Sequence, residues 1–251
     1  MITEHSDEHE AVEEENYFVS MTDMMVGLVF IFIILLMYFA MQFRDVTEEL
    51  SGADRTRTQI LQQIQQSLHD KGVEVSIDTQ NGVLRLPDSI LFDSARAELK
   101  PEGISAVAHL GAALTDVLPC YVDGAIKRRP DCPKTKHRVE SVYVEGHTDA
   151  DRYSGSGALK DNWDLSVVRA TNTYRALTQL QPLLGDLCVE KSGHCEPVLS
   201  VSGYGPQRPV ASATGTAEQR KAANRRIDLR LIMVTPDAGA TVRQLHERLS
   251  N

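Results

Sequence analysis

Residues 17–40 read YFVSMTDMMVGLVFIFIILLMYFA, and this apolar stretch decides how the rest of the chain is organised. About 20 helical residues, each rising about 1.5 Å, cross about 30 Å of hydrocarbon, so the stretch is long enough to span a bilayer. It is too long for the core of a signal peptide, its N-terminal flank carries no Lys or Arg, and no small-x-small cleavage site follows. We therefore predict a retained membrane-spanning helix over residues 17–41.

One acid, Asp23, lies about one turn inside this stretch. An ionised carboxylate near the bilayer centre costs about 2.5–3.5 kcal/mol, and burial favours its neutral form. Ser20, Asp23 and Gly27 share one helical face, and the two small residues would let that face approach a second helix closely. Asp23 is therefore a candidate proton carrier in a packed seam. The alternative is a span that starts at Met24, with Asp23 hydrated among the headgroups.

The charges that flank the span and the cysteines point to opposite orientations. Residues 1–16 are acidic and lack Lys and Arg, whereas Arg44 follows the span, so the positive-inside rule alone would place the C-terminal side in the cytoplasm. All four cysteines follow the span in two locally spaced pairs, which suits disulfides in an oxidising periplasm. We therefore predict an inner-membrane protein with a cytoplasmic N-terminus and a periplasmic C-terminal domain.

The pairing of the cysteines has three possible connectivities. A zinc site that also uses His137 or His194 is an alternative, although the spacing fits no tight Cys-x-x-Cys knuckle, and we expect no metal. The favoured disulfides are Cys120–Cys132 and Cys188–Cys195.

Length and charge limit what the chain can be. Its 251 residues can hold one span and one domain of ordinary size. A net charge of −9, without a basic stripe interleaved with aromatic residues, argues against nucleic-acid binding. We predict an α+β fold after the span. The expected parts are an acidic cytoplasmic tail (1–16), the transmembrane helix (17–41), a juxtamembrane linker and helix (42–70), a folded domain (71–236) and a C-terminal tail (237–251).

Hydrophobic spacing gives the elements of that domain. A helix over about 53–70 carries a short apolar stripe, which either packs on the domain or pairs with a second copy. Residues 119–136 look like an inserted, solvated loop bracketed by two cysteines and rich in basic residues. Contact of this loop with an anionic wall polymer is a second interpretation. The other expected elements are a hairpin turning at Asn81-Gly82, a helix after Pro101 with Ile104, Val107, Leu110, Leu114 and Val117 on one face, a strand at 139–144, a helix at 165–180, a strand at 198–201, a helix at 216–223 and a strand at 227–234.

Four ordered motifs carry the chemistry: VEGHTD at 144–149, NWDLSVVRA at 162–170, SGYG at 202–205 and RKAANRRID at 220–228. The first delivers Asp149 to a loop after a strand, and the second places Arg169 on the following helix. A carboxylate and a guanidinium brought together in this way can hold a zwitterion, the first binding its ammonium and the second its carboxylate. An internal Asp149–Arg169 salt bridge that stabilises the loop is the alternative.

These motifs resemble the OmpA-like peptidoglycan-binding domain shared by outer-membrane anchors and flagellar stator B subunits, over about residues 73–234. The resemblance implies a β/α sandwich in which Asp149 and Arg169 grip the zwitterionic diaminopimelate head of the wall peptide. The loop 150–161 is longer than is usual in that family, and the two cysteine-bracketed inserts also depart from its simplest pattern. The resemblance further implies that Thr148, Asn162, Leu165 and Arg220 line the same pocket and that Asn224, Arg225 and Arg226 support it.

The N-terminal span resembles stator B subunits too, in which an acid on a single helix carries protons. The phrase SMTDMM at 20–25 and the acidic tail are most similar to the B subunits of Zorya anti-phage defence motors. That resemblance implies a homodimer clasped by a multi-span A-type subunit, a pentamer, with peptidoglycan and the membrane as further partners and no cofactor. A flagellar stator is the close alternative, and a static wall tether is the rival from another class.

Enzymatic chemistry finds little support in the sequence. His147 and Asp149 with Ser154 or Ser156 suggest a hydrolase triad, but no nucleophile elbow is present. The glycines at 203 and 205 lack the Lys and the spacing of a phosphate loop. A wall-cleaving carboxylate pair among Glu145, Asp149 and Asp151 is disfavoured by the nearby Arg169. We therefore expect a protein that is not an enzyme.

Overall fold

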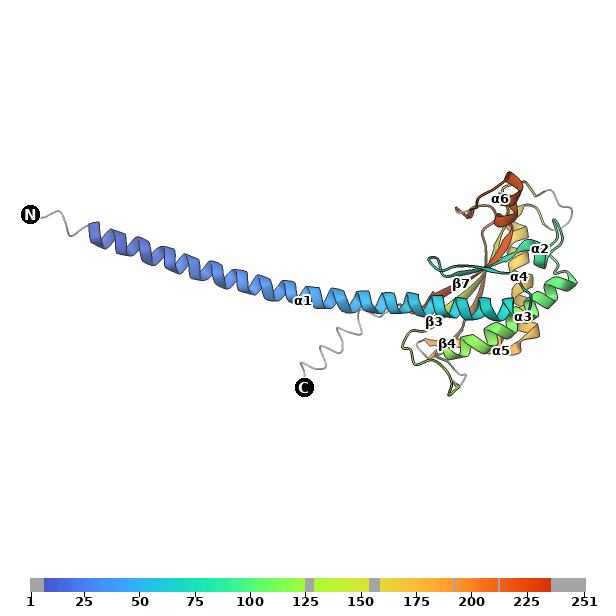
Figure 1. Ribbon diagram of the computed structural model, residues 1–251, viewed down its shortest axis with the longest axis horizontal. Coiled ribbons are helices and arrows are strands. Elements are labelled where there is room, and N and C mark those ends of the chain that lie inside the picture. The colour runs from blue at the N-terminus through green and yellow to red at the C-terminus, as the bar shows by residue number, and fades with distance from the viewer. Residues whose placement is uncertain (1–6, 125–128, 154–158, 192, 212, 236–251) are drawn as a thin grey trace, which may run out of the picture. The chain divides into compact units, whose positions relative to one another are not determined.

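The computed structural model describes residues 7–124, 129–153, 159–191, 193–211 and 213–235, with the side chains of residues 7–20 and 45 left out (Figure 1). The chain divides into two compact units, residues 1–50 and 51–251. The first six residues of the acidic tail, the C-terminal tail 237–251 and Ser154 and Ser156 lie outside the described residues.

The first unit is helical. Helix α1 runs Asp7–His69, so the predicted linker from residue 42 is helical as well. This segment contains no proline, and most of its residues favour helix. In the apolar part, the large side chains from Met24 to Phe39 are 47–75% exposed. Among the described residues, two segments have the length and composition of a membrane span. One lies in Met21–His69, where the most apolar stretch of 18 residues has a mean hydropathy of 2.7 and no buried residue. The other is Pro101–Cys120, where just over half of the corresponding stretch is buried.

A five-stranded sheet forms the centre of the second unit. Its order is β1 (Ser76–Asp78), β2 (Val83–Pro87), β7 (Arg226–Met233), β3 (Val139–His147) and β6 (Leu199–Gly203). Strands β3 and β6 are parallel, and the other neighbours are antiparallel. The β1–β2 hairpin turns at Asn81-Gly82 as predicted, with Gly82 at φ 67°, a conformation that favours glycine. A separate hairpin consists of β4 (Cys188–Lys191) and β5 (His194–Pro197).

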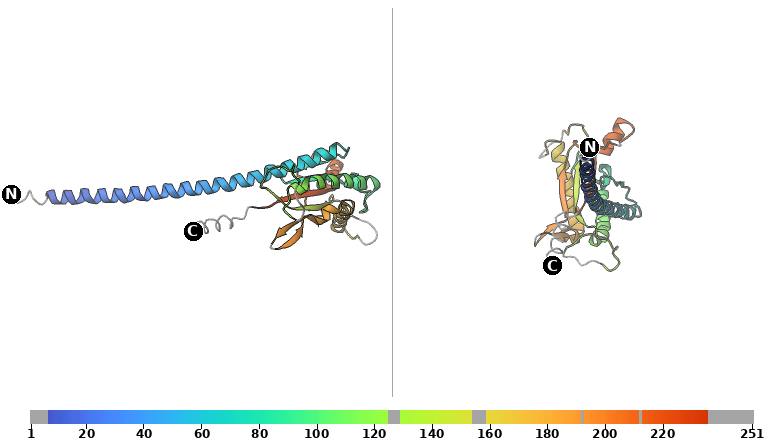
Figure 2. Two further views of the ribbon diagram at one scale, coloured as in Figure 1. Left: turned by 90° about the horizontal axis from the view of Figure 1, so that it is seen from below. Right: turned by 90° about the vertical axis from the view of Figure 1, so that its left-hand side faces the viewer.

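Helices cover the apolar face of this sheet. They are α2 (Asp88–Leu91), α3 (Pro101–Val117), the 3-10 turn η1 (Leu118–Cys120), α4 (Asn162–Leu180) and α5 (Pro182–Asp186). Helix α6 (Ala217–Asn224) precedes β7 and buries none of its residues. Figures 1 and 2 show α3 beside the last turns of α1. Side chains alternate along β7, so Ile227, Leu229 and Leu231 enter the core, while Arg226, Asp228 and Arg230 project from the opposite face.

The predicted α+β class and the order of its elements are confirmed. The stripe on the last turns of α1 belongs to the core of this unit: Ile60, Leu61, Ile64 and Leu68 are at most 1% exposed. Packing on the domain is therefore the correct interpretation of this stripe, and pairing with a second copy is not. On α3 one expected core residue is different, because Ile104 lies near the helix start and is 45% exposed.

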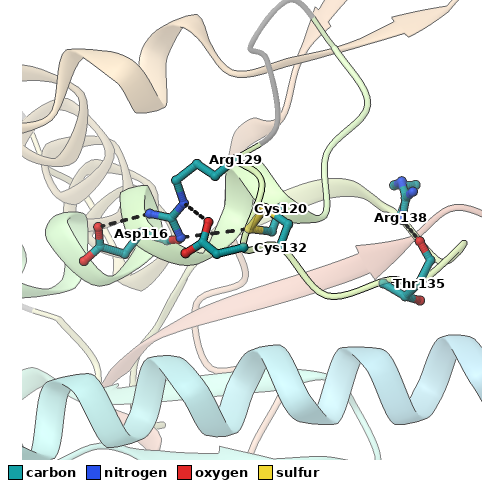
Figure 3. The surroundings of a disulfide bond; sticks show 7 residues. Asp116, Cys120, Arg129, Cys132, Thr135 and Arg138 are labelled. Carbon is teal, nitrogen blue, oxygen red and sulfur yellow. Dashed lines mark hydrogen bonds and ion pairs between the residues drawn. A yellow bond between two sulfur atoms is a disulfide. The ribbon is translucent and has the colours of Figure 1, made fainter.

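The insert between the first two cysteines is partly core. Residues 118–122 are buried, whereas the prediction described a solvated loop. The disulfide Cys120–Cys132 closes this segment, and Arg129 lies against it, donating to the Asp116 carbonyl oxygen at 2.7 Å (Figure 3). The second disulfide, Cys188–Cys195, joins β4 to β5. Both favoured pairings are present, so no described cysteine is left for the zinc alternative.

Candidate functional site

A cavity of about 530 Å³ opens where β3 ends. Its walls come from the segment that follows β2, the loop after β3, the first turns of α4, and the junction of α6 with β7. The residues that line it are Asp88, Ser89, Phe92, Asp93, Ser94, Ala95, Thr148, Asp149, Asp151, Arg152, Tyr153, Asn162, Leu165, Arg169, Glu218 and Arg225.

Close packing of α4 on β3 sets the position of the loop after β3. At Gly146 a Cβ atom would overlap the carbonyl oxygen of Ser166, so the approach of helix and strand requires glycine. The N–H of Thr148 then donates to the Gly205 carbonyl oxygen at 3.0 Å, which holds the start of the loop. The chain therefore leaves β3 with Asp149 at the edge of the cavity.

The first turn of α4 holds the other end of this loop. The Asp161 side chain caps the helix by accepting from the N–H groups of Trp163 and Asp164. Asn162 Nδ2 donates to the carbonyl oxygens of Asp149, at 3.3 Å, and Asp151, at 2.8 Å. The predicted site residue Asn162 thus supports the loop through its backbone while it lines the cavity.

Asp149 has a cationic partner within the protein. Its Oδ2 accepts from Arg225 Nη1 at 2.6 Å, and its Oδ1 accepts from the N–H of Asp151 at 3.1 Å. Arg225 also donates to Glu218 at 3.3 Å. The hydrogen bond with Asp149 raises the pKa of Arg225, so this guanidinium is charged at neutral pH.

Arg169 is 3% exposed and binds the segment on the far side of the cavity. Its Nη1 donates to Asp88 Oδ2 at 3.1 Å, while its Nε and Nη2 donate to the carbonyl oxygens of Arg96, at 2.8 Å, and Asp93, at 3.4 Å. Its guanidinium also lies 4.9 Å from the centre of the Phe92 ring. Burial lowers the pKa of Arg169, and the charge of Asp88 opposes this shift.

The structure therefore brings Asp149 and Arg169 to one cavity, as the motifs predicted, but gives each a different partner. Asp149 forms a salt bridge with Arg225, which the prediction gave only a supporting role. Arg169 forms a salt bridge with Asp88, which the prediction missed. Asp88 and Arg169 are 81 positions apart, and no local spacing signals their contact. Of the remaining predicted lining residues, Thr148 and Leu165 are buried in the wall.

Three predicted residues lie elsewhere. Arg220 donates to the Gly215 carbonyl oxygen on the exposed side of α6. Asn224 Oδ1 accepts from the N–H of Val210 at 2.8 Å. Arg226 is buried on the opposite face of the sheet. Among the described residues, none of these three lines the cavity at the end of β3.

Helix α6 forms one wall of the cavity without entering the core. None of its eight residues is buried. A capping box between Thr216 and Gln219 fixes its N-terminus. Salt bridges join it to the rest of the site, Lys221 to Asp151 at 2.7 Å and Glu218 to Arg225 at 3.3 Å. Polar contacts at its surface therefore hold this wall in place.

A polar cluster occupies the other face of the sheet. Glu145, His147 and Asp228 are each 1% exposed and present potential metal-ligand atoms within 4.8 Å of one another. Arg230, however, donates to both oxygens of Glu145, and Arg226 Nε donates to both oxygens of Asp228. The guanidinium groups thus supply hydrogen bonds and positive charge to both carboxylates without a metal ion, which makes the cluster a salt-bridge network.

The pKa values in this cluster follow from its contacts. Burial acts to raise the pKa of Glu145, but the nearby His147 imidazole and the hydrogen bonds from Arg230 outweigh it and lower the value to about 2. Burial raises the pKa of Asp228 despite its contact with Arg226. Glu145 is therefore ionised throughout the physiological range, and its pairing is part of the stability of the fold.

The second unit is thus an α+β domain with a charged cavity at one end of its sheet, and its sequence is similar to two curated proteins. No protein-family model matches the chain. It is 28% identical over 174 residues to Motility protein B of Bacillus subtilis (strain 168), covering 68% of this chain and 54% of that protein. It is also 28% identical over 168 residues to Probable lipoprotein YiaD of Escherichia coli (strain K12), covering 67% of this chain and 59% of that one. The chain therefore spans little more than half the length of these proteins.

Three solved structures have a similar arrangement of elements over part of the chain. A putative MotB-like protein from Desulfovibrio vulgaris has 21% identity and a TM-score of 0.48, over 71% of this chain and 94% of that one. The periplasmic domain of Helicobacter pylori MotB has 16% identity and a TM-score of 0.44, over 67% and 86%. The cell wall anchor of the T6SS from Pseudomonas aeruginosa has 22% identity and a TM-score of 0.45, over 69% and 97%.

Proposed function

We propose that this chain is a stator-type B subunit, held in the inner membrane by its apolar helix and fixed to peptidoglycan by its C-terminal domain. Asp23 carries protons through a complex with a multi-span partner, and the wall holds the B subunit still while the partner moves. The observation that carries the proposal is the cavity at the end of β3, which is lined by two carboxylate–guanidinium pairs, Asp88–Arg169 and Asp149–Arg225.

The charges of the cavity suit a zwitterionic ligand. Its lining holds five acids and three arginines, and two carboxylate–guanidinium pairs stand among them, Asp88 with Arg169 and Asp149 with Arg225. A neutral ligand with one ammonium and one carboxylate adds no net charge to this set and offers a partner of each sign. The diaminopimelate head of a wall peptide has these two groups, so peptidoglycan is the ligand that we assign to the cavity.

The membrane helix supports the motor part of the proposal. Its apolar side chains need a covering of lipid or protein, because half or more of the surface of most of them is exposed in the isolated chain. An acid within such a helix usually faces a partner or a water path. We infer a homodimer inside a pentamer of A-type subunits, with the N-terminus in the cytoplasm and the C-terminal domain in the periplasm.

Two biological settings fit this architecture. The motif around Asp23 and the acidic tail favour an anti-phage defence motor of the Zorya type, which would pass its motion to cytoplasmic effectors. The similarity to Motility protein B favours a flagellar stator equally well. The identity of the neighbouring genes separates the two, since a defence system would lie beside nuclease or helicase genes and a stator beside flagellar genes.

The proton hypothesis is tested by expressing the chain with its genomic neighbours and replacing Asp23. We expect Asp23→Asn to abolish phage protection or swimming, because an amide cannot exchange a proton, and Asp23→Glu to retain part of the activity. Copurification of the partner establishes that the complex still assembles. Full activity of the assembled Asp23→Asn complex would refute proton carriage.

Wall binding is tested by sedimentation of the purified full-length chain with isolated sacculi. We expect Asp149→Ala and Arg169→Ala to remove cosedimentation, whereas Arg175→Ala, an exposed arginine on the same helix as Arg169, leaves it unchanged. Because Arg169 also binds backbone carbonyls, its variant is compared with wild type by circular dichroism. A folded double variant that still cosediments would contradict the assignment of the cavity.

A further inference from the structure

Asp88 is held in the wall of the cavity by strand β2, which precedes it, and by the junction of α6 with β7. It is the first residue of α2 and follows Pro87, the last residue of β2. Its N–H donates to the Arg225 carbonyl oxygen at 3.0 Å. The residue is 8% exposed, so its carboxylate is nearly enclosed, and what remains accessible faces the cavity.

The two oxygens of this carboxylate differ. Oδ2 accepts from Arg169 Nη1 at 3.1 Å and lies 3.8 Å from Arg225 Nε. Oδ1 is buried and accepts no hydrogen bond from any described residue. A buried charged oxygen without a donor is costly, and native structures satisfy nearly all such atoms. Oδ1 therefore has no donor among the described residues and is available to a donor group of a bound ligand.

A second acceptor in the same wall is also unpartnered. Thr148 is 5% exposed, and its Oγ1 makes no hydrogen bond with any described residue. It precedes Asp149, whose negative charge contributes to raising the pKa of Asp88, although burial is the main cause. The two carboxylates thus interact across the cavity, and the wall between them presents an additional free acceptor.

We propose that Asp88 is a ligand-binding residue whose Oδ1 accepts a hydrogen bond from the ammonium of the ligand, with Thr148 and Asp149 as the neighbouring acceptors. An ammonium has three donors and can satisfy three acceptors at once. Asp88 also holds Arg169 through Oδ2, so a single carboxylate joins the ammonium to the guanidinium that receives the ligand carboxylate. The cavity thereby selects an ammonium and a carboxylate on one carbon. This inference rests on the proposed wall-binding function.

Three small molecules of similar length test this selection by isothermal titration with the full-length chain in detergent. They are meso-diaminopimelate, which has both groups at each end, cadaverine, which has only ammonium groups, and pimelate, which has only carboxylates. We expect wild type to bind diaminopimelate at least about tenfold more tightly than either of the others, because each lacks half of the charged hydrogen bonds.

Substitution of Asp88 then tests the residue itself. We expect Asp88→Asn to weaken diaminopimelate binding by about tenfold or more, since it replaces a charged acceptor by a neutral amide. Asp186→Asn, the same substitution at an exposed aspartate of α5 outside the cavity, is the control and should bind as wild type does. If Asp88→Asn does not fold, Asp88→Glu keeps the charge for Arg169 but displaces the oxygens, and it should lose affinity as well.

The outcomes distinguish the role of Asp88 from the wall-binding function on which it rests. Wild type that binds neither diaminopimelate nor sacculi would overturn the wall-binding function and this assignment together. Wild type that binds, with a folded Asp88 variant of equal affinity, would overturn the role of Asp88 alone and leave water as the donor to Oδ1.

Discussion

Replacement of Glu145 by glutamine should remove a defined, pH-dependent part of the stability of the C-terminal unit. The side chain of Glu145 is 2% exposed, and its Oε1 and Oε2 accept from Arg230 Nε and Nη2, each at 2.9 Å. Glutamine has nearly the same shape but cannot ionise, and its amide group would face one of the guanidinium donors. The variant therefore tests the charge of Glu145 with little change in packing.

The magnitude follows from the pKa of Glu145. A shift from 4.5 to about 2 in the folded protein corresponds to about 3 kcal/mol of stability at pH 7. Because the folded pKa is the lower one, this stability is fully present above pH 4.5 and is lost as the pH falls toward 2. At pH 3 about 1 kcal/mol should remain, so the free energy of unfolding of wild type should fall about 2 kcal/mol further than that of Glu145→Gln between pH 7 and pH 3.

Urea unfolding of the full-length chain in detergent measures this difference. Trp163 is the single tryptophan and lies in the first turn of α4, so its fluorescence reports on the C-terminal unit. Glu140→Gln is the matched control on β3, because the Glu140–Lys191 pair is partly exposed and should contribute less than about 1 kcal/mol. Parallel stability curves for wild type and Glu145→Gln from pH 7 to pH 3 would refute the reasoning.

Three further substitutions test the packing of the same unit, each by urea unfolding. Leu110→Ala should cost about 2–5 kcal/mol because Leu110 is fully buried, whereas Ile104→Ala on the same helix should change stability by less than about 0.5 kcal/mol; similar losses would contradict the assigned faces of α3. Gly146→Ala should cost about 1–3 kcal/mol because the new Cβ overlaps a backbone carbonyl of α4, and an unchanged midpoint would contradict this close approach. Replacing Cys120 and Cys132 together by serine should cost about 2–3 kcal/mol from the loop that they close, while alkylation of the native protein without reductant should label no cysteine in the described residues.

Much of the fold could be predicted because its patterns are local. The turn at Asn81-Gly82, the apolar face of α3 and the alternation along β7 each follow from spacing within a few residues. The continuous helix α1 was harder to predict, because a polar segment after the span is equally compatible with an irregular linker and with an exposed helix. The buried start of the 119–136 insert was missed for a related reason, since its many basic residues concealed the apolar ones beside Cys120.

Part of the lining of the cavity was predictable from the sequence, and the pairing of its charges was much less so. Asp149 and Arg169 stand in recognisable motifs, and the structure places both at one cavity. Which residue neutralises each of them depends on contacts between distant segments, as with Asp88 and Arg169. Burial of Glu145 was likewise beyond sequence reasoning, because a polar residue on a half-covered sheet is expected to face water, and Arg230 reaches it from 85 positions away.

The attachment of α6 by salt bridges, without a buried residue, has a dynamic consequence. A helix without buried side chains can open locally at a small fraction of the global unfolding free energy, so its amide hydrogens should exchange with solvent far sooner than those of α4. Added salt should accelerate that exchange further, because it screens the exposed salt bridges of Lys221 and Glu218 while leaving the apolar core unaffected. Opening of this helix would expose the cavity from one side, which gives a long ligand a lateral route of entry.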